Sequence, residues 1–175
     1  MVIERDNPKG IDSLIAKMQS VINERLSWAN LIYIYPRCYI QYRDNNITVE
    51  HYLKNGDYVM INNAEQNKCF FVLFGNQQKQ TDGLYSAQLD LYFALNLKEI
   101  YPDVLYRCDE DVRMDVLMVI ERFSLGLNTV NVNQVITGID NVYRGVYFNR
   151  DDDTQPHHCF KIRLDIKYDK DGYNC

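Results

Sequence analysis

Two segments of the chain carry the hydrophobic period of 3.6 residues that is typical of amphipathic helices. The first covers residues 10–27, and its apolar face consists of Ile11, Leu14, Ile15, Met18, Ile22 and Leu26. The second covers Asp109–Leu125, where acidic residues open the first turn and complement the helix dipole. Gly126 follows as the expected stop. The pattern therefore predicts two helices, each with an apolar face that must pack against another layer.

The region between them, residues 31–97, favours β-strands. Pro36 separates two short apolar runs, Leu31–Tyr35 and Cys38–Tyr42, because proline presets φ for a turn. Two further short strands are expected at Ile47–Leu53 and Tyr58–Ile61. The last part predicts a long β-hairpin over Lys68–Leu97, in which a compact apolar run precedes a strand of alternating apolar and polar residues. Alternation over this length predicts a strand with one face on a core.

The C-terminal region, residues 128–168, returns to the strand pattern. We expect a hairpin in which Asn141–Phe148 pairs with His157–Tyr168 around the polar loop Asn149–Pro156. In the last strand, inward-facing apolar residues alternate with outward-facing charges of both signs: Lys161, Arg163, Asp165 and Lys167. Residues 169–175 form a short polar tail.

The order of elements predicts one α+β domain over residues 1–175, with a mostly antiparallel sheet and two packed helices. Hydrophobic residues make up 46% of the chain, which is enough for a core of its own. No apolar run approaches the ~20 residues of a membrane helix, and the charged N-terminus predicts no signal peptide. The net charge of −5 disfavours broad wrapping of nucleic acid, which needs a positive surface.

One cluster contains residue types that bind metals: Asp151, Asp152 and Asp153, followed by His157, His158 and Cys159. Such residues could hold a divalent ion that activates water in a hydrolase. However, two adjacent strand residues point to opposite faces, and the three aspartates lack the glycine-punctuated spacing of a calcium loop. We therefore expect a solvated acidic loop, with no metal and no cofactor.

The chain contains no nucleotide-binding or nucleophile motif from which a catalytic residue could be assigned. Its five cysteines are widely spaced and form no Cys-x-x-Cys pair, so we expect buried, reduced thiols. A Cys–His nucleophile pair lacks a supporting glycine-rich turn. Tyrosines interleave with arginines over Tyr33–Arg43, a pattern that suits base stacking but is more often the surface of an edge strand. We expect no enzyme.

In the order of its elements, the chain resembles the tail-terminator and tail-completion proteins of tailed bacteriophages. The resemblance rests on a helix over Ile11–Leu26, a long hairpin over Lys68–Leu97, a second helix over Asp109–Leu125 and a closing hairpin over Asn141–Tyr168. With 17 Asn, 14 Tyr and only five Ala, the composition suits a phage of AT-rich gut bacteria, such as a crAss-like short-tailed one. The family is defined by fold and ring assembly, and it has no catalytic motif.

The resemblance implies a virion structural protein, a ring-forming head–tail connector or tail-terminator subunit. Such a protein would be found at the head–tail junction or tail of the virion, and in the host cytoplasm during assembly. Its partners would be copies of itself and neighbouring portal, connector or tail proteins, while DNA would pass non-specifically through the ring. The alternatives are a cytoplasmic ligand- or protein-binding α+β domain and, third, a metal-dependent hydrolase.

Ring assembly of this kind needs two different contact patches on each subunit. One is expected on the second helix, at apolar residues outside the core-facing stripe: Met114, Leu117 and Met118. The other is expected on an edge strand, at Tyr33 and Tyr35. The resemblance also implies that the acidic loop Asp151–Asp153 faces the lumen or a neighbouring ring, where its charge would repel DNA phosphates. A solvated turn without such a role is the alternative.

Overall fold

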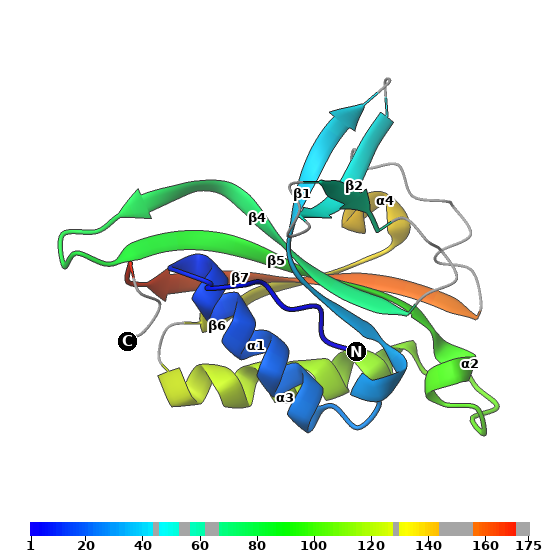
Figure 1. The fold of residues 1–175 in the computed structure, drawn as a ribbon. Helices are drawn as coiled ribbons and strands as arrows, with labels where there is room; N and C mark the ends of the chain where they lie inside the picture. Colours follow the sequence, from blue (N-terminus) through cyan, green and yellow to red (C-terminus); the bar gives the residue numbers. More distant parts are fainter. Residues whose placement is uncertain (44–45, 53–56, 62–66, 128–129, 144–155, 171–175) are drawn as a thin grey trace.

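A seven-stranded sheet forms the centre of the computed structural model (Figure 1). The strands follow the order β3-β2-β1-β4-β5-β7-β6, and all neighbours are antiparallel except β1 and β4. Their bounds are Tyr33–Arg43 (β1), Asn46–Tyr52 (β2), Tyr58–Met60 (β3), Lys68–Lys79 (β4), Tyr85–Asn96 (β5), Val130–Thr137 (β6) and His157–Tyr168 (β7). The predicted α+β fold is confirmed. The structure describes residues 1–43, 46–52, 57–61, 67–127, 130–143 and 156–170.

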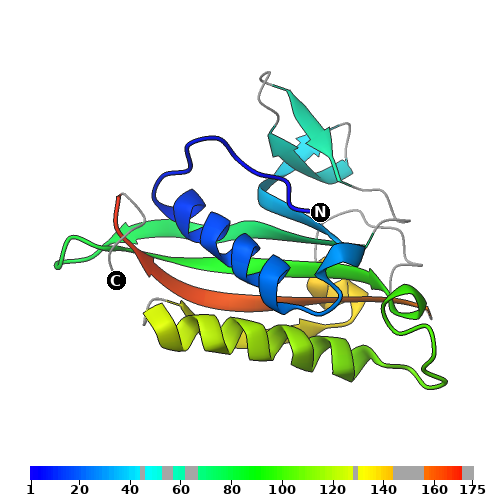
Figure 2. The same ribbon diagram turned by 60° about the horizontal axis from the view of Figure 1, so that its bottom comes forward.

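Two long helices cover one face of the sheet: α1, Ile11–Arg25, and α3, Asp109–Leu127 (Figure 2). They occupy the two predicted helical segments. The short helices are η1 (Ala29–Leu31), α2 (Leu97–Ile100) and α4 (Ile139–Val142). The apolar stripes of α1 and α3 pack against the inward side chains of β4, β5 and β7 and form the main core. In this core, the apolar residues that recur every 3.6 positions in the helices face those that alternate along the strands.

Three aromatic side chains occupy the centre of the main core. Phe93 of β5 and Phe160 of β7 stack with ring centroids 4.9 Å apart, and the Trp28 ring meets Phe93 edge-on at 6.4 Å. The Trp28 indole also donates its Nε1–H to Asp115 Oδ2 at 3.0 Å. This bond ties the segment after α1 to α3, so the two helices are fixed to each other as well as to the sheet.

The predicted hairpin over Lys68–Leu97 is formed by β4 and β5, and its turn extends beyond the ends of α1 and α3 (Figure 1). Pairing between the two strands shifts between Phe74 and Gln78. Gly75 lies in this bulge with φ 73°, a conformation that favours glycine. The bulge bends β4 immediately after Phe74, whose side chain lies on the face of the sheet opposite the helices.

Pro36 and Gly126, which are predicted to end their elements, lie inside a strand and a helix. β1 runs continuously through Pro36, and its pairing with β4 shifts between Ile34 and Arg37. A strand tolerates proline at such a bulge because the ladder there needs no N–H donor. Likewise, α3 continues through Gly126 to Leu127. One glycine costs a helix only about 1 kcal/mol, which tertiary packing can offset.

The closing hairpin also differs from the prediction. Asn141 lies in α4, where the N–H groups of Asn141 and Val142 donate to the Gly138 carbonyl. Gly138 has φ 81° and turns the chain out of β6, and Phe148 lies outside the described residues. β7 pairs with β5 along one side and with β6 along the other. The predicted pairing of Asn141–Phe148 with the last strand is therefore wrong at its first residues.

A smaller core lies on the face of the sheet opposite α1 and α3, at the end formed by β1, β2 and α4 (Figure 1). We call this face helix-free because neither long helix packs on it. Phe70 and Tyr92 stack there at 4.8 Å, and Tyr92 also stacks on Tyr143 at 5.8 Å. Its other buried members are Tyr35, Cys38, Val49, Ile61, Val72, Val142 and Cys159. Both faces of the sheet are covered at this end. Toward the hairpin turn, no described element covers the helix-free face.

The smaller core gives a prediction for pH dependence. His51 of β2 is buried with its ring 5.2 Å from that of Tyr35, and burial lowers the pKa of His51. The unfolded chain therefore takes up the proton first as the pH falls below the ordinary histidine value of about 6.5. We expect the free energy of unfolding to decrease through that range and to level off once folded His51 is protonated too.

Urea unfolding at about pH 7.5 and about pH 5.5 measures this dependence, since the two values bracket the ordinary histidine pKa. His51→Phe keeps an aromatic ring beside Tyr35 and should lose the part of the pH dependence that histidine causes. His157→Gln is the matched control and should retain it. The same slope in wild type and His51→Phe would contradict the assignment.

Candidate functional site

Three charged side chains lie together on the helix-free face of β5 and β7. Asp90 is only 1% exposed, and its carboxylate accepts two hydrogen bonds from Arg163, at 2.7 Å from Nε and 2.9 Å from Nη2. Lys161 Nζ lies 3.3 Å from the same carboxylate. The β5–β7 register brings them together, because Asp90 lies opposite Arg163 and Tyr92 lies opposite Lys161.

Aromatic rings border the two cations. Lys161 Nζ donates to the Tyr92 hydroxyl at 3.3 Å and lies 5.0 Å from the centre of the ring, and the Arg163 guanidinium lies 3.8 Å from the centre of the Phe74 ring. Burial lowers the pKa of Lys161, although Asp90 opposes this effect. The hydrogen bond to Asp90 raises the pKa of Arg163. The cluster thus holds two cations against one carboxylate.

This cluster corrects the prediction that Lys161 and Arg163 face solvent. Lys161 is buried and Arg163 is half-buried, because side chains of β4 and β6 border them on the helix-free face. The sequence did contain a signal for the cluster. Asp90 is the one charge within Tyr85–Leu97, the strand whose alternation is otherwise uncharged. Only the register of β5 and β7 shows which residues it meets.

The two cations of the cluster, Lys161 and Arg163, line a hollow of about 660 Å³. The apolar part of its wall comes from Ile40, Phe74, Val135 and Ile136. The polar part comes from Tyr92, Gln134, Thr137, Asn141, Lys161 and Arg163. Its volume is within the range of small-molecule sites, roughly 300–1,000 Å³. We call this hollow, defined by these ten residues, the charged groove.

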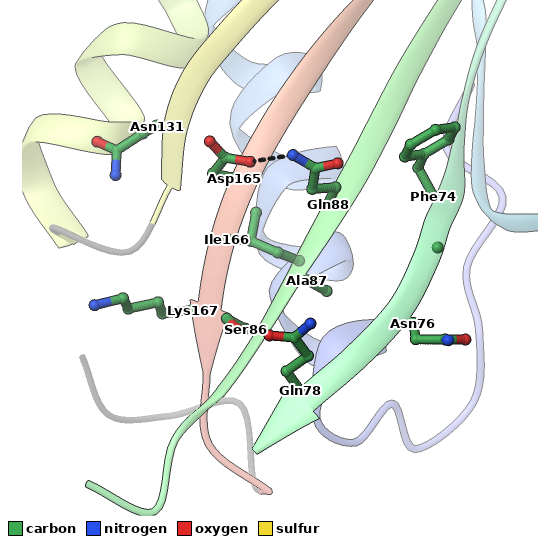
Figure 3. Close-up of a pocket in the computed structure, with 11 residues that line it drawn as sticks. Phe74, Asn76, Gln78, Ser86, Ala87, Gln88, Asn131, Asp165, Ile166 and Lys167 are labelled. Carbon is green, nitrogen blue, oxygen red and sulfur yellow. Dashed lines mark hydrogen bonds between the residues drawn. The ribbon is translucent and has the colours of Figure 1, made fainter. Parts of the chain in front are cut away.

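A second hollow, of about 440 Å³, adjoins the charged groove at Phe74 and continues toward the hairpin turn (Figure 3). Its carboxylate is that of Asp165, which accepts from Gln88 Nε2 at 2.8 Å and from Asn133 Nδ2 at 2.7 Å. Both oxygens therefore have amide donors. Among the described residues that line it, this hollow has no buried cation comparable with Lys161.

The interface residues predicted on the second helix differ in exposure. Met114 and Met118 are each 46% exposed on α3, whereas Leu117 is half-buried against the main core. The segment before α3 adds exposed Leu105 and Tyr106. We call Met114 and Met118 the helix patch. Leu117 contributes to the packing of α3 and offers little surface to a partner.

Tyr33 and Tyr35 do not lie on an edge strand, so that part of the prediction is wrong. β1 is flanked by β2 and β4, Tyr33 is half-buried, and Tyr35 is buried in the smaller core. The described sheet ends in β3 on one side and β6 on the other, and all three residues of β3 are exposed. Together with Tyr52, whose ring lies 5.3 Å from that of Tyr58, they form what we call the edge patch: Tyr52, Tyr58, Val59 and Met60. Sequence reasoning missed it because strand order is not a local property.

The remaining predictions concern the acidic loop, a metal site and the cysteines. Asp151–Asp153 lie outside the described residues, so their relation to a lumen stays a prediction. Within the described ranges, no three His, Cys, Asp or Glu side chains come close enough to hold a metal ion. Four cysteines in these ranges are buried thiols outside any disulfide: Cys38, Cys69, Cys108 and Cys159.

Comparison with known proteins adds no family. No protein-family model matches the chain, and no curated protein matches it. In the part of the chain that the structure describes, no helix has the length and apolar character needed to cross a membrane. A function for this chain therefore has to be inferred from the charged groove, the helix patch and the edge patch.

Proposed function

We propose that the chain is a virion structural protein, a subunit of a ring-forming head–tail connector or tail terminator through which phage DNA passes. The observation that supports this is that two separate elements each carry a group of exposed apolar side chains, the edge patch on β2 and β3 and the helix patch on α3; other exposed apolar residues, such as Leu105 and Tyr106, lie elsewhere. A ring needs two different patches, because each subunit presents one surface and receives another until rotation closes the circle.

The edge patch has the chemistry of a surface that receives another chain. Among the described strands, β3 pairs only with β2, so the other side of its backbone has no strand partner. Proteins that stay monomeric protect such an edge by keeping the strand very short, as the three residues of β3 do, or with lysine, proline or a bulge. The edge patch instead carries two tyrosines, a valine and a methionine, and Met60 is 57% exposed. Aromatic residues and methionine are enriched in protein interfaces.

The helix patch supplies the second surface. Thioether side chains are flexible and adapt to the shape of a partner, so Met114 and Met118 suit a contact with a strand of different geometry. The two patches lie on separate elements, α3 under the sheet and β3 at its edge (Figure 1). Contact between the edge patch of one subunit and the helix patch of the next would therefore propagate from copy to copy.

Paired cysteine variants test this contact. In a Cys175→Ser background, Val59→Cys and Met118→Cys are made separately and together, then oxidised mildly and examined by native mass spectrometry. Cys38 and Cys69 should stay unreactive, because they are buried and burial raises the pKa of both thiols. We expect covalent oligomers from the double variant and covalent dimers from a mixture of the two single variants.

Each single variant alone should give no disulfide-linked dimer, since equivalent positions do not meet in a head-to-tail ring. Lys98→Cys is an exposed control that should not cross-link to Val59→Cys. Electron microscopy of the assembled chain should show closed rings with a lumen. A chain that stays monomeric at high concentration, with and without neighbouring virion proteins, would contradict the proposal, and so would self-linking of Met118→Cys through a two-fold contact.

The charged groove favours a second candidate function, a ligand-binding α+β domain. Ligand sites combine apolar walls with a few convergent polar groups, and the charged groove has both. Binding without self-association would favour this alternative over the ring subunit. A metal-dependent hydrolase has less support, because the described residues bring no set of metal ligands together.

A further inference from the structure

We propose that the charged groove is a binding site for a carboxylate carried on a small apolar body, with Lys161 as the residue that recognises the carboxylate. The site does not depend on ring assembly, and a chain that stays monomeric would leave it intact. The inference rests on three features of the groove: a buried cation that Asp90 does not need, a free donor on that cation, and apolar walls beside it.

The first feature is the surplus of positive charge. Arg163 already satisfies the Asp90 carboxylate with two hydrogen bonds, at 2.7 and 2.9 Å, in the side-by-side geometry that arginine offers to a carboxylate. Lys161 is a second cation on the same carboxylate, and its side chain is only 8% exposed. Burying an ammonium group costs free energy unless it is paired. Asp90 therefore needs no second cation; Asp165, whose charge also acts on Arg163, takes its hydrogen bonds from Gln88 and Asn133.

The second feature is the position of the Lys161 ammonium group. An ammonium has three N–H donors. Among the described residues, Lys161 Nζ has two partners, the Asp90 carboxylate at 3.3 Å and the Tyr92 hydroxyl at 3.3 Å. The same side chain lines the groove, so the remaining donor is available to an acceptor that enters it. An anionic acceptor would make a charge-assisted hydrogen bond and balance the surplus charge.

The third feature decides what carries the anion. Ile40 and Phe74 are exposed at the groove, and Val135 and Ile136 are half-buried along it. A bare ion such as chloride or phosphate would leave these apolar side chains in water, whereas an alkyl or aryl carboxylate would cover them. The polar rim of Gln134, Thr137 and Asn141 offers further contacts without adding charge. The groove therefore fits an amphipathic carboxylate better than an inorganic anion.

Titration with three six-carbon probes tests the chemistry. Hexanoate, 1-hexanol and hexylammonium share the apolar body and differ in charge, and backbone amide shifts in NMR spectra report where each binds. We expect hexanoate to shift residues of β6 and β7 around the groove, with a dissociation constant on the order of 1 mM for so small a ligand. The dissociation constant of the alcohol should be higher than that of hexanoate by about tenfold or more, because the alcohol lacks the charge-assisted hydrogen bond.

Two variants assign the binding to Lys161. Lys161→Met keeps the length and apolar stem of the side chain and should weaken hexanoate by about tenfold or more. Lys167→Met is the matched control, a lysine on the same strand and the same face but outside the groove, and should leave the dissociation constant within about twofold. Gln134→Glu introduces a carboxylate at an exposed position on the groove wall, and it should weaken hexanoate through repulsion without disturbing the fold.

Binding that prefers hexanoate and depends on Lys161 supports the site. Three results would overturn it: hexanoate that causes no shifts up to its solubility, 1-hexanol that binds as tightly as hexanoate, or hexanoate affinity that Lys161→Met leaves unchanged. If Lys161→Met did not fold, Gln134→Glu would decide, and unchanged hexanoate affinity in that variant would overturn the site as well.

Discussion

Replacing Asp90 with Asn is expected to lower the free energy of unfolding by about 3–5 kcal/mol, because it removes one member of a buried charged cluster and leaves the others unpaired. The Asp90 carboxylate lies against both Lys161 and Arg163. The asparagine side chain has nearly the same shape, so the loss would come from charge and not from packing. Urea unfolding at pH 7 measures this loss of free energy. The dependence of the free energy of unfolding on urea concentration should be the same in both proteins.

Two variants on the same face serve as controls. Asp165→Asn changes a half-buried carboxylate whose partners are amides, and it should cost no more than about 1 kcal/mol. Lys161→Met should also be tolerated within about 1 kcal/mol, since Asp90 keeps its two hydrogen bonds to Arg163. If Asp90→Asn cost no more than Asp165→Asn, the cluster would not be the buried ionic centre that its geometry indicates.

The comparison of these variants also separates stability from binding. A Lys161→Met chain that folds at least as well as wild type and no longer binds hexanoate would show that the second cation serves recognition and not the fold. Natural proteins commonly keep such residues at a cost to stability, because selection acts on function once the fold is stable enough. The charged groove would then be a case in which the least necessary charge of a cluster is the functional one.

The sequence predicts those parts of the fold that depend on local periodicity. The apolar stripe of residues 10–27 and the alternation of Tyr85–Leu97 identify α1 and β5 within one or two residues. These patterns are local, since each side chain's direction follows from its own element. They also predict which side of β5 carries the main core, where Leu89, Leu91 and Phe93 are fully buried.

The candidate sites depend on contacts that the sequence pattern does not contain. Strand order places β1 between β2 and β4, which buries Tyr35 and makes β3 one of the two edge strands. The β5–β7 register places Asp90 opposite Arg163, although both fit an ordinary solvent-facing alternation. The prediction assumed one buried face for the sheet. Residues of β4 and β6 and the smaller core on the second face are the physical reason why Lys161 is buried and Arg163 half-buried, whereas Lys167 stays exposed.

Replacing Phe160 with Ala should lower the free energy of unfolding by about 3–5 kcal/mol, the usual cost of a large aromatic cavity in a core. Phe160 is fully buried in the main core and stacks on Phe93 at 4.9 Å, with the two rings only 8° from parallel. The cavity would open between β5, β7 and the helix layer, where backbone shifts cannot easily fill it. Urea unfolding monitored by circular dichroism gives the value.

Phe74→Ala is the matched control, since it removes the same side chain from the opposite face of the same sheet. Phe74 is 48% exposed and contacts the Arg163 guanidinium, so its loss should cost about 1 kcal/mol or less. The difference between the two losses of unfolding free energy measures how much more the face under the helices contributes to stability. Phe160 packs under the helices, whereas Phe74 borders hollows on the opposite face. Equal losses would mean that the helix-free face contributes as much to folding as the main core does, and that Phe74 is held in place more firmly than a groove wall requires.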